Sequence, residues 1–483
     1  MMKKELGVIE LTMASVTGMV GSGWLFSAFY ASSIAGPYSV ISWLIGALII
    51  ISLALVYAEL GSRMPMAGAA AAYPYYTNGN VAGTINSWSL FLGYASTPPL
   101  ETIASITYMS FLVPGLITSS GFLTFKGIVL SVVLLFLFFF INSIGIKTTS
   151  KVNNYVSYLK IIIPLMTSFF FIFTIFSIKN FTYTGGIAYR SIFTAVPAAG
   201  IAFSFLGFRQ AVELSGEAKN PQKTVPKAIF LSVGIATALY VIVQIAFIGS
   251  FQWNGLNPGN WASIASSSYK NGPMLVLASV LGLGSLVAIL LFDGIISPLG
   301  TSNIYQTSTA RVSYQMSSMG YFPKKFSQLS SKNVPFYSLL FDFIIMILFV
   351  LPFPSWQSLV SINSGLSIIA YMSGPVSLLI FRKQEISSSG FKLPFAGIIA
   401  PMAFAFSALI IYWSGFPDTF YMSIIAFAGL ILFAFKNKGT EMELKSGMWI
   451  ILILVVIPLV SYLGSYNLNV LKYPFDLLLV FIA

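Results

Sequence analysis

Four charged residues lie at isolated positions inside apolar segments of this sequence: Glu101, Lys160, Arg209 and Asp293. An ionisable group within a lipid bilayer is costly and usually marks the path of a proton, an ion or charged cargo. Asp293 could pair with Lys160 or Arg209, or it could carry a proton itself. Arg209 is four residues from Glu213, a spacing at which two side chains on a helix can neutralise each other. These residues are therefore candidates for binding a proton, an ion or a charged solute within the bilayer.

The sequence contains no histidine and no cysteine. It therefore lacks an imidazole base, a thiolate nucleophile, a disulfide and the usual metal or haem ligands. The 13 acidic residues are scattered along the chain, so they form no metal cluster, and no P-loop motif is present to bind ATP. We predict no catalytic residue, no metal site and no cofactor, and we expect that the protein is not an enzyme.

The elements that must position these charges are membrane helices. Hydrophobic residues make up 57% of the chain and charged residues 8%, with a mean hydropathy of +0.87, far outside the range of soluble domains. We predict an all-α integral membrane protein with one domain, 1–483, and 12 to 14 spans of about 20 residues. The first span is too long for a cleavable signal peptide. The predicted spans are 8–30, 37–60, 84–113, 127–146, 153–178, 191–215, 226–250, 274–308, 335–353, 356–381, 394–414, 417–435, 447–465 and 468–483.

Basic residues predict the orientation of these spans. Most of the 25 lysines and arginines fall on the side of the N-terminus, and cytoplasmic loops carry such an excess. We therefore predict a multi-pass protein of the cell membrane with both termini in the cytoplasm. The net charge of +12 follows from this bias and requires no nucleic acid partner. The basic residues left on the outer side are Lys126, Lys179, Arg190, Lys270 and Lys472.

Two spans carry glycines where a membrane helix would be opened. Gly21, Ser22 and Gly23 lie near the middle of the first span, and Gly200 and Gly207 enclose an aromatic stretch in the sixth. Small residues also let helices pack closely, so the glycines of the first span alone do not distinguish a helix break from close packing. A pair of glycine-interrupted spans in corresponding positions, however, indicates a transporter binding site.

Four motifs resemble the amino acid/polyamine/organocation superfamily of permeases. They lie in order within residues 18–340, and Arg209 stands where many members have an acidic residue. The motifs are GSGWLF, AGPYSVISWLIGALIIISLALVYAELGSRMPMAGAAAAYPYY, FSFLGFRQAVELSGEAKNPQKTVPKAI and ARVSYQMSSMGYFPKKFSQLSSKNVPFYSLL.

The resemblance implies a LeuT-like fold with two inverted repeats of five spans and discontinuous helices one and six. The repeats would be 8–178 and 191–381, with additional C-terminal helices in 394–483. Substrate would bind between spans one, three, six, eight and ten.

The broken spans suit an α-amino acid. The free N–H groups of Ser22, Gly23 and Trp24 would bind its carboxylate at the positive end of the outer half-helix. Carbonyls near Met19 and from Phe203 to Leu206 would accept from its ammonium. By resemblance, Phe203 or Trp24 would form an aromatic gate. The full predicted substrate site is Met19, Gly21, Ser22, Gly23, Trp24, Phe203, Ser204, Leu206, Gly207 and Phe208.

Side-chain selectivity would come from residues 96–101, from Phe208 and Arg209, and from residues 363–367. The consecutive prolines before Glu101 should kink span three and free carbonyls. If Arg209 points into the cavity, its charge would disfavour cationic substrates.

Lys160 matches, by resemblance, a lysine of proton-coupled members. It would stand between spans one and eight, where sodium-coupled relatives hold their ion. The alternative is a lysine that snorkels to the interface.

These observations predict a secondary transporter of α-amino acids that works by alternating access and is coupled to protons. An amino acid exchanger and an amine or polyamine permease remain alternatives, and a non-transporting amino acid sensor is a third. The expected partners are a small amino acid substrate, the coupling proton and the lipid bilayer. The sequence leaves open which amino acid is carried and the oligomeric state.

Overall fold

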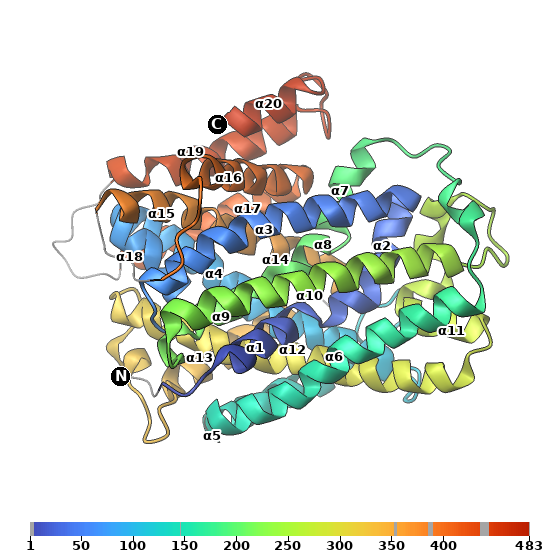
Figure 1. Ribbon diagram of the computed structural model, residues 1–483, viewed down its shortest axis with the longest axis horizontal. Helices are drawn as coiled ribbons and strands as arrows, with labels where there is room; N and C mark the ends of the chain where they lie inside the picture. Colours follow the sequence, from blue (N-terminus) through green and yellow to red (C-terminus); the bar gives the residue numbers. More distant parts are fainter. Residues whose placement is uncertain (1–3, 145, 352–354, 385–389, 435–443, 483) are drawn as a thin grey trace.

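The chain is an all-α membrane protein. The computed structural model describes residues 4–144, 146–351, 355–384, 390–434 and 444–482, and these residues form helices and loops without a β-strand. Figure 1 shows the long helices running side by side as one bundle. Eight of the described helical segments are long and apolar enough to cross a membrane, or nine if a bent pair counts as one span.

The described helices follow the predicted spans closely. In chain order they are α1 (Val8–Met19) and α2 (Ser22–Ala35), α3 (Ser39–Arg63), α4 (Ala69–Met109), α5 (Phe125–Ile144), α6 (Ile146–Thr174), α7 (Arg190–Ala198), α8 (Ile201–Phe205) and α9 (Gln210–Glu213), α10 (Pro221–Ser250), α11 (Pro273–Val280) and α12 (Gly284–Ser318), α13 (Phe336–Val350), α14 (Trp356–Tyr371) and α15 (Ser373–Lys383), α16 (Ala396–Trp413), α17 (Asp418–Phe427) and α18 (Ile431–Ala434), α19 (Leu444–Leu463) and α20 (Phe475–Ile482).

Helix α4 differs from the prediction for span three. It begins at Ala69, before the expected start at residue 84, and has 41 residues. The helix continues through Pro98 and Pro99, and its one residue with non-helical backbone angles is Gly79, at φ 73° and ψ −166°. The backbone angles at the two prolines thus stay helical, and the kink expected there remains a prediction. The break falls earlier, at a glycine that tolerates positive φ.

The segment predicted to span the membrane at 468–483 is also different. Over its described residues the helix is α20, Phe475–Ile482, with eight residues. At a rise of about 1.5 Å per residue it covers about 12 Å, which is short of a hydrocarbon core of about 30 Å. Figure 1 shows α20 projecting from the bundle beyond α16 and α19.

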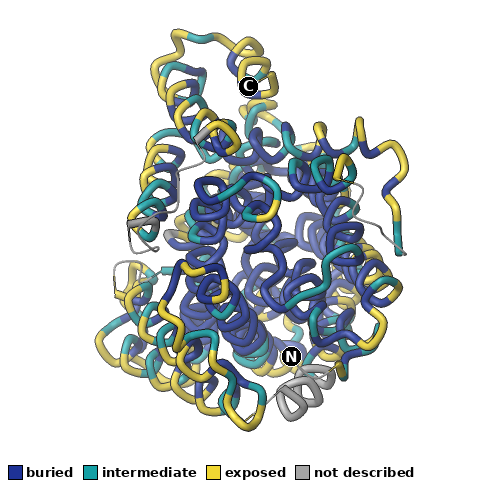
Figure 2. Tube along the Cα trace, turned by 90° about the vertical axis from the view of Figure 1, so that its left-hand side faces the viewer, coloured by how far each residue is buried: buried dark blue, intermediate teal, exposed yellow. Residues whose placement is uncertain are grey.

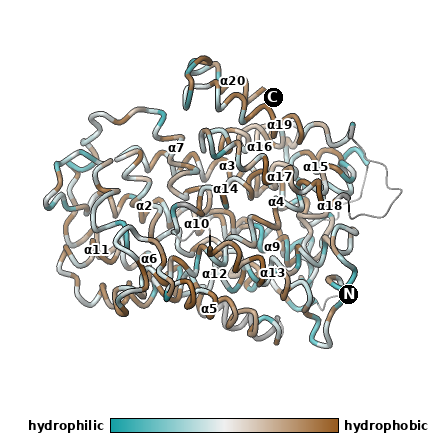
Figure 3. Tube along the Cα trace, turned by 180° about the vertical axis from the view of Figure 1, so that it is seen from behind, coloured by the Kyte–Doolittle hydropathy of each residue, from teal (hydrophilic) through white to brown (hydrophobic). Residues whose placement is uncertain are grey.

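Burial separates a central core from a lipid-facing surface. Figure 2, which looks along the bundle, shows buried backbone at the centre and exposed backbone at the rim. The rim is still apolar, as Figure 3 shows for α5 and α6. Large side chains such as Phe136 and Phe173 are exposed there. This pattern suits a bilayer, because in water such a surface would aggregate.

Ion pairs gather at the end of the bundle that holds the N-terminal segment. Leu6 forms a backbone bridge with Ala218, close to the buried pair Glu217 and Arg311 at 3.1 Å. Glu59 pairs with Arg63 at 2.7 Å and with Arg382 at 2.5 Å. Glu59 and Glu217 are thus both paired with basic residues. The charges of these ion pairs therefore neutralise one another at this end of the bundle.

Candidate functional site

The first span is broken where the Gly-Ser-Gly stretch predicts. Helix α1 ends at Met19 and α2 begins at Ser22, and Gly21 between them has φ −124° and ψ −130°. A β-carbon on Gly21 would clash with the hydroxyl of Thr301 and the carboxylate of Glu101. A glycine is therefore required here by close approach of α4 and α12.

The second break lies in the sixth span and begins at Gly200. This residue has φ +77°, which ends α7 and starts the short helix α8. A 3-10 segment, Leu206–Arg209, follows, and the two parts of the span are bent by 56°. The prediction placed the opening at Phe203 to Leu206, but α8 holds Phe203 in a helical turn. The break comes earlier because Gly200 adopts the left-handed conformation.

The two breaks pack directly against each other. A β-carbon on Gly207 would lie 2.5 Å from the carbonyl oxygen of Gly18, and one on Gly23 would clash with the Ser204 hydroxyl. The Tyr240 hydroxyl donates to the carbonyls of Met19 at 2.7 Å and Ser204 at 3.1 Å. One side chain of α10 thus contacts a carbonyl of each broken span, and the Met19 carbonyl also accepts from the Gly21 N–H at 3.1 Å. Unpaired backbone groups at this depth would each cost several kcal/mol.

Other predicted carbonyls are also paired within the protein. The Tyr371 hydroxyl donates to the Leu206 carbonyl at 3.0 Å, and the Ser15 hydroxyl donates to that of Phe208 at 3.2 Å. The Phe208 ring packs edge-on against Tyr371, with centroids 5.6 Å apart. These two carbonyls of the second broken span are therefore bonded within the protein.

The carboxylate of Glu101 occupies the N-terminus of α2. Its Oε2 atom accepts from the backbone N–H of Ser22 at 2.8 Å, which is one of the donors that the sequence assigns to a substrate carboxylate. The side chain is fully buried, and Oε1 has no hydrogen-bond partner among the described residues. Its charge inside an apolar span was a signal of importance, but the contact itself joins residues 79 positions apart.

Lys160 lies between α1 and α12, as the resemblance implies. Its Nζ donates to the Thr17 carbonyl at 3.0 Å and to the Thr301 hydroxyl oxygen at 2.6 Å. The side chain has no exposed surface. The alternative of a snorkelling lysine was therefore wrong, because a snorkelling ammonium would reach the interface.

Asp293 is buried on α12 within electrostatic range of Lys160. It forms no direct ion pair with Lys160 or Arg209 in the described part of the chain. Its Oδ2 atom has no hydrogen-bond partner among those residues. The pairing considered from the sequence is not present in this state, and Asp293 remains a neighbouring charge.

Aromatic side chains cover the broken spans on one side. Trp356 donates from its indole nitrogen to the Ser22 hydroxyl at 2.7 Å. Its ring stacks on Phe26 with centroids 5.1 Å apart and meets the Phe203 ring edge-on at 6.2 Å. The sequence missed Trp356, whereas Phe203 does lie in the predicted aromatic cover. Trp24 is buried nearby on α2.

Arg209 is enclosed by tyrosines on the other side of the second break. Its guanidinium carbon lies 3.8 Å from the ring centroid of Tyr371 and 4.4 Å from that of Tyr57. Nη2 lies 3.3 Å from the Glu213 carboxylate, which confirms the predicted pair. The Nε and Nη1 groups of Arg209 have no partner among the described residues, so two buried donors are available.

The polar residues of spans three and ten also meet. The amide nitrogen of Asn363 in α14 lies within hydrogen-bond distance of the Gly93 carbonyl, at 2.7 Å, and of the Ser96 and Thr97 hydroxyl oxygens, each at 2.9 Å. The two predicted selectivity segments are thus in direct contact. The described residues hold no group of three or more metal-binding side chains.

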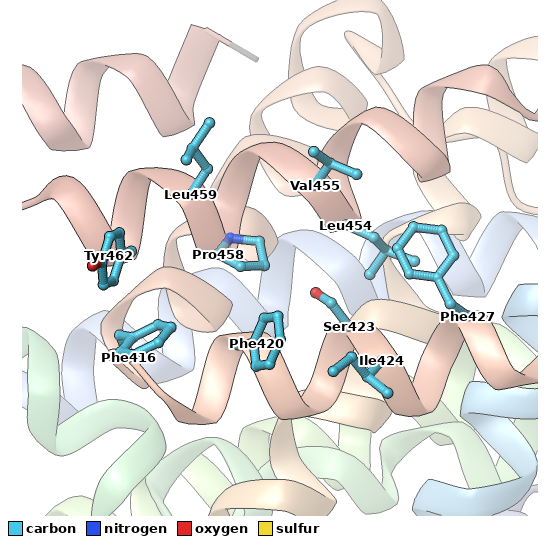
Figure 4. A pocket seen from close by; sticks show the side chains of 10 residues that line it. All are labelled: Phe416, Phe420, Ser423, Ile424, Phe427, Leu454, Val455, Pro458, Leu459 and Tyr462. Atoms are coloured by element: carbon cyan, nitrogen blue, oxygen red, sulfur yellow. The ribbon is translucent and has the colours of Figure 1, made fainter.

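A separate groove lies on the lipid-facing side between α17 and α19. Figure 4 shows its lining, which is formed mainly by apolar side chains such as Phe420 and Leu454. Its polar side chains are Ser423 and Tyr462. This lining offers no charge to a zwitterion, so the groove does not compete with the centre of the bundle as a site for an amino acid.

Two broken spans that meet at a buried polar centre within a bundle of membrane helices define a membrane transporter. The sequence profile described as amino acid permease matches residues 6–419, and the chain belongs to this family. The resemblance seen in the motifs is thereby confirmed.

Three relatives align over most of the chain. The glutamate/serine transporter AimA of Bacillus subtilis (strain 168) is 35% identical, with 99% of this chain and 91% of that relative covered. The aspartate-proton symporter of the same organism is 32% identical, with 100% and 94% covered. The branched-chain amino acid permease BcaP, also from this organism, is 24% identical, with 92% and 95% covered. The protein is thus a secondary amino acid permease and a multi-pass membrane protein.

Proposed function

We propose that this permease accumulates α-amino acids by coupling their transport to protons at Lys160. The observation that carries the proposal is the pair of hydrogen bonds from Lys160 to Thr17 of α1 and to Thr301 of α12. Similarity to an aspartate-proton symporter supports it. A protonated Lys160 links the two helices, and loss of the proton weakens the link.

The coupling follows from where α1 ends. Thr17 lies in the last turn before the break, so the Lys160 ammonium holds the inner half of the broken span against α12. Its deprotonation removes a charged donor, and charged hydrogen bonds contribute about 1.5–3 kcal/mol each. This free energy is large enough to bias the position of the inner half-helix. Proton binding on one side and release on the other would then drive alternating access.

The substrate would lie across the two breaks. Its carboxylate would accept from the N–H groups of Ser22, Gly23 and Trp24, and its ammonium would donate to carbonyls around Met19 and Phe203 to Leu206. Gly21, Ser204 and Gly207 allow the close approach that these contacts need, and Phe208 lines the inner side. The repeats proposed for this fold are 8–178 and 191–381, followed by the additional helices of 394–483.

Arg209 suggests which side chains are accepted. Its Nε and Nη1 groups are buried and have no partner within the described part of the chain, so they suit a side-chain carboxylate or hydroxyl, and the charge of Arg209 opposes lysine or arginine. The names of two relatives, one a glutamate/serine transporter and one an aspartate-proton symporter, agree with such a choice. We therefore favour acidic and small hydroxylated amino acids as cargo. An amine without a carboxylate would gain nothing from the positive end of α2, which argues against polyamines.

The ion pairs at one end of the bundle indicate how the protein is oriented in the membrane. The ion-paired end of the bundle, which includes Arg63, Arg311 and Arg382, also holds the N-terminal segment. Basic residues favour the cytoplasmic side. We therefore assign this end and the N-terminus to the cytoplasmic side of the plasma membrane. The C-terminal end is not assigned to that side as the sequence suggested, because α20, with eight residues, is too short to cross back from the outer end of α19.

The test is uptake of radiolabelled serine, glutamate and aspartate into proteoliposomes. Wild type and Lys160→Ala are compared with an imposed proton gradient, a sodium gradient or neither. We expect proton-driven accumulation that the variant loses while it still binds substrate. Sodium-driven uptake, or proton-driven uptake that survives in Lys160→Ala, would overturn the role of Lys160. Exchange alone would favour an antiporter, and binding without flux would favour a sensor.

A further inference from the structure

The best donor for a substrate carboxylate is already used by the protein. The Ser22 N–H begins α2, a helix of 14 residues, and it points to Glu101 Oε2 at 2.8 Å. Anions are favoured at such a helix end because free N–H groups and the helix dipole both point toward them. The anion in place here is a side chain of α4.

The second oxygen of the same carboxylate lacks a partner. Oε1 of Glu101 is buried and has no hydrogen bond among the described residues, although it lies against Gly21. A buried charged oxygen without a donor costs free energy, so this arrangement is not an optimised structural cap. The Glu101 carboxylate resembles a bound ligand that uses only one of its two oxygens.

We propose that Glu101 is an intramolecular stand-in for the substrate carboxylate, which holds the α2 amides in the empty transporter and is displaced when an amino acid binds. This inference rests on the proposed function, because it assumes that the substrate carboxylate binds at Ser22. Two carboxylates cannot share one N–H donor without strong repulsion, since like charges at hydrogen-bond distance oppose each other. Binding therefore requires Glu101 to leave.

The Lys160 cluster lies beside the Glu101 carboxylate. Gly21 lies against both Glu101 and Thr301, and Thr301 accepts from Lys160 at 2.6 Å. Lys160 already attracts Glu101 electrostatically. The other titratable groups that face Glu101 or this cluster are Asp293, Tyr240 and Tyr305.

Displacement by the substrate thus moves a negative charge toward the coupling lysine. The ammonium of Lys160 would hold its proton more firmly while the site is filled. Occupancy of the substrate site and protonation of Lys160 become linked through one side chain. Glu101 therefore acts as a positioning and specificity residue.

The first experiment compares binding of an acid with binding of its amide. Purified protein is titrated with L-serine and L-serinamide, and with L-glutamate and its α-amide, at one pH and without a gradient. The variants are Glu101→Gln, which keeps the shape of the side chain, and Asp342→Asn. Asp342 is a buried acid that bonds to Ser313 in α12 and serves as the matched control.

Removal of the competing charge should tighten binding of the acid. Hydrogen bonds to charged groups differ from neutral ones enough to expect about a tenfold gain in affinity for the acid in Glu101→Gln. The affinity for the amide should change little, and Asp342→Asn should leave the ratio of the two affinities unchanged. An unchanged or reduced preference for the acid in Glu101→Gln would overturn the inference.

A second measurement uses the wild-type chain and so does not depend on folding of a variant. A hydrophobic carbodiimide modifies carboxyl groups, and mass spectrometry reports the labelled fraction of Glu101. We expect the serine or glutamate to change this fraction at least twofold, whereas the amides do not. Equal labelling with and without bound acid would contradict displacement.

The outcomes separate the two proposals. Normal proton-driven uptake with an unchanged ratio of acid to amide affinity would overturn only the role of Glu101. Wild type that neither binds nor carries any of the three amino acids would overturn the proposed substrate class, and the inference with it.

Discussion

The ammonium of Lys160 lies 2.6 Å from the hydroxyl oxygen of Thr301. That hydroxyl lies 2.8 Å from the Thr17 carbonyl and donates to it. The lysine donates to the same carbonyl at 3.0 Å, so three groups from α1, α6 and α12 form a closed triangle. The triangle sits one turn from the first break. Any change in the charge of Lys160 therefore acts directly on the Thr17 carbonyl, which lies in the last turn of the inner half-helix.

Thr301→Val should weaken coupling. The valine keeps the shape of the side chain but offers Lys160 no acceptor, and a lost hydrogen bond to a charged group costs about 1.5–3 kcal/mol. We expect proton-driven accumulation in proteoliposomes to fall about tenfold or more, with Thr301→Ser restoring most of it.

The matched control is Thr309→Val on the same helix. The Thr309 hydroxyl donates to the Tyr305 carbonyl within α12 and touches neither Lys160 nor the breaks. Equal losses in Thr301→Val and Thr309→Val would show that the triangle has no special role.

Tyr240→Phe should destabilise the fold. The change removes a hydroxyl that lies 2.7 Å from the Met19 carbonyl and 3.1 Å from the Ser204 carbonyl, and loss of such a hydrogen bond costs about 0.5–1.5 kcal/mol. The thermal unfolding midpoint of the purified protein should fall. The Tyr108 hydroxyl is buried without a partner among the described residues, so Tyr108→Phe should be neutral or stabilising. The reverse order of the two midpoints would contradict this account.

Gly207→Ala should block the close contact of the two broken spans. The new β-carbon would lie 2.5 Å from the Gly18 carbonyl oxygen, and overpacking of this kind costs about 1–3 kcal/mol. We expect reduced uptake per folded molecule, measured after size-exclusion chromatography. Gly397→Ala is the control, because a β-carbon there meets no atom within 4 Å. Wild-type uptake by Gly207→Ala would show that the breaks tolerate separation.

Arg209 and Glu213 should depend on each other for stability. Removal of one partner of a buried ion pair leaves an uncompensated charge and costs about 3–5 kcal/mol. Glu213→Gln should therefore lower the unfolding midpoint strongly, and the double change Arg209→Met with Glu213→Gln should recover part of the loss. Additive losses would mean that the 3.3 Å contact contributes little.

Single cysteines can report the orientation, because the chain contains no cysteine of its own. Lys179 and Lys324 are both exposed and are predicted on opposite sides of the membrane. In intact cells a membrane-impermeant maleimide should label Lys179→Cys, and it should label Lys324→Cys only after permeabilisation. Labelling in the opposite order would invert the proposed topology.

Local residue types predicted much of this fold and part of the site. The first break could be predicted because two glycines flank a serine in an apolar span, and the Arg209 and Glu213 pair because its spacing is one helical turn. Lys160 stood out by charge and by resemblance. These signals all lie within one segment of the chain.

Contacts between distant segments could not be predicted in this way. Trp356 and Ser22 are 334 positions apart, and Tyr240 and Met19 are 221 apart. Their meeting depends on how the helices pack, which hydropathy does not encode. The Ser302 hydroxyl likewise donates to the Pro98 carbonyl at 3.3 Å across 204 positions of the chain.

The hydrogen-bond partners of Glu59 are synthesised at different stages of translation. Arg63 lies one helical turn away, so this buried carboxylate has a partner as soon as α3 has been synthesised. Arg382 is synthesised 323 residues later and donates to both oxygens of Glu59, next to the backbone N–H of Leu393 at 2.7 Å. Until these later residues are synthesised, Arg63 is the basic partner that the Glu59 carboxylate has available. Its last donors arrive only when the second half of the chain has been inserted, so their arrival marks the assembly of the core.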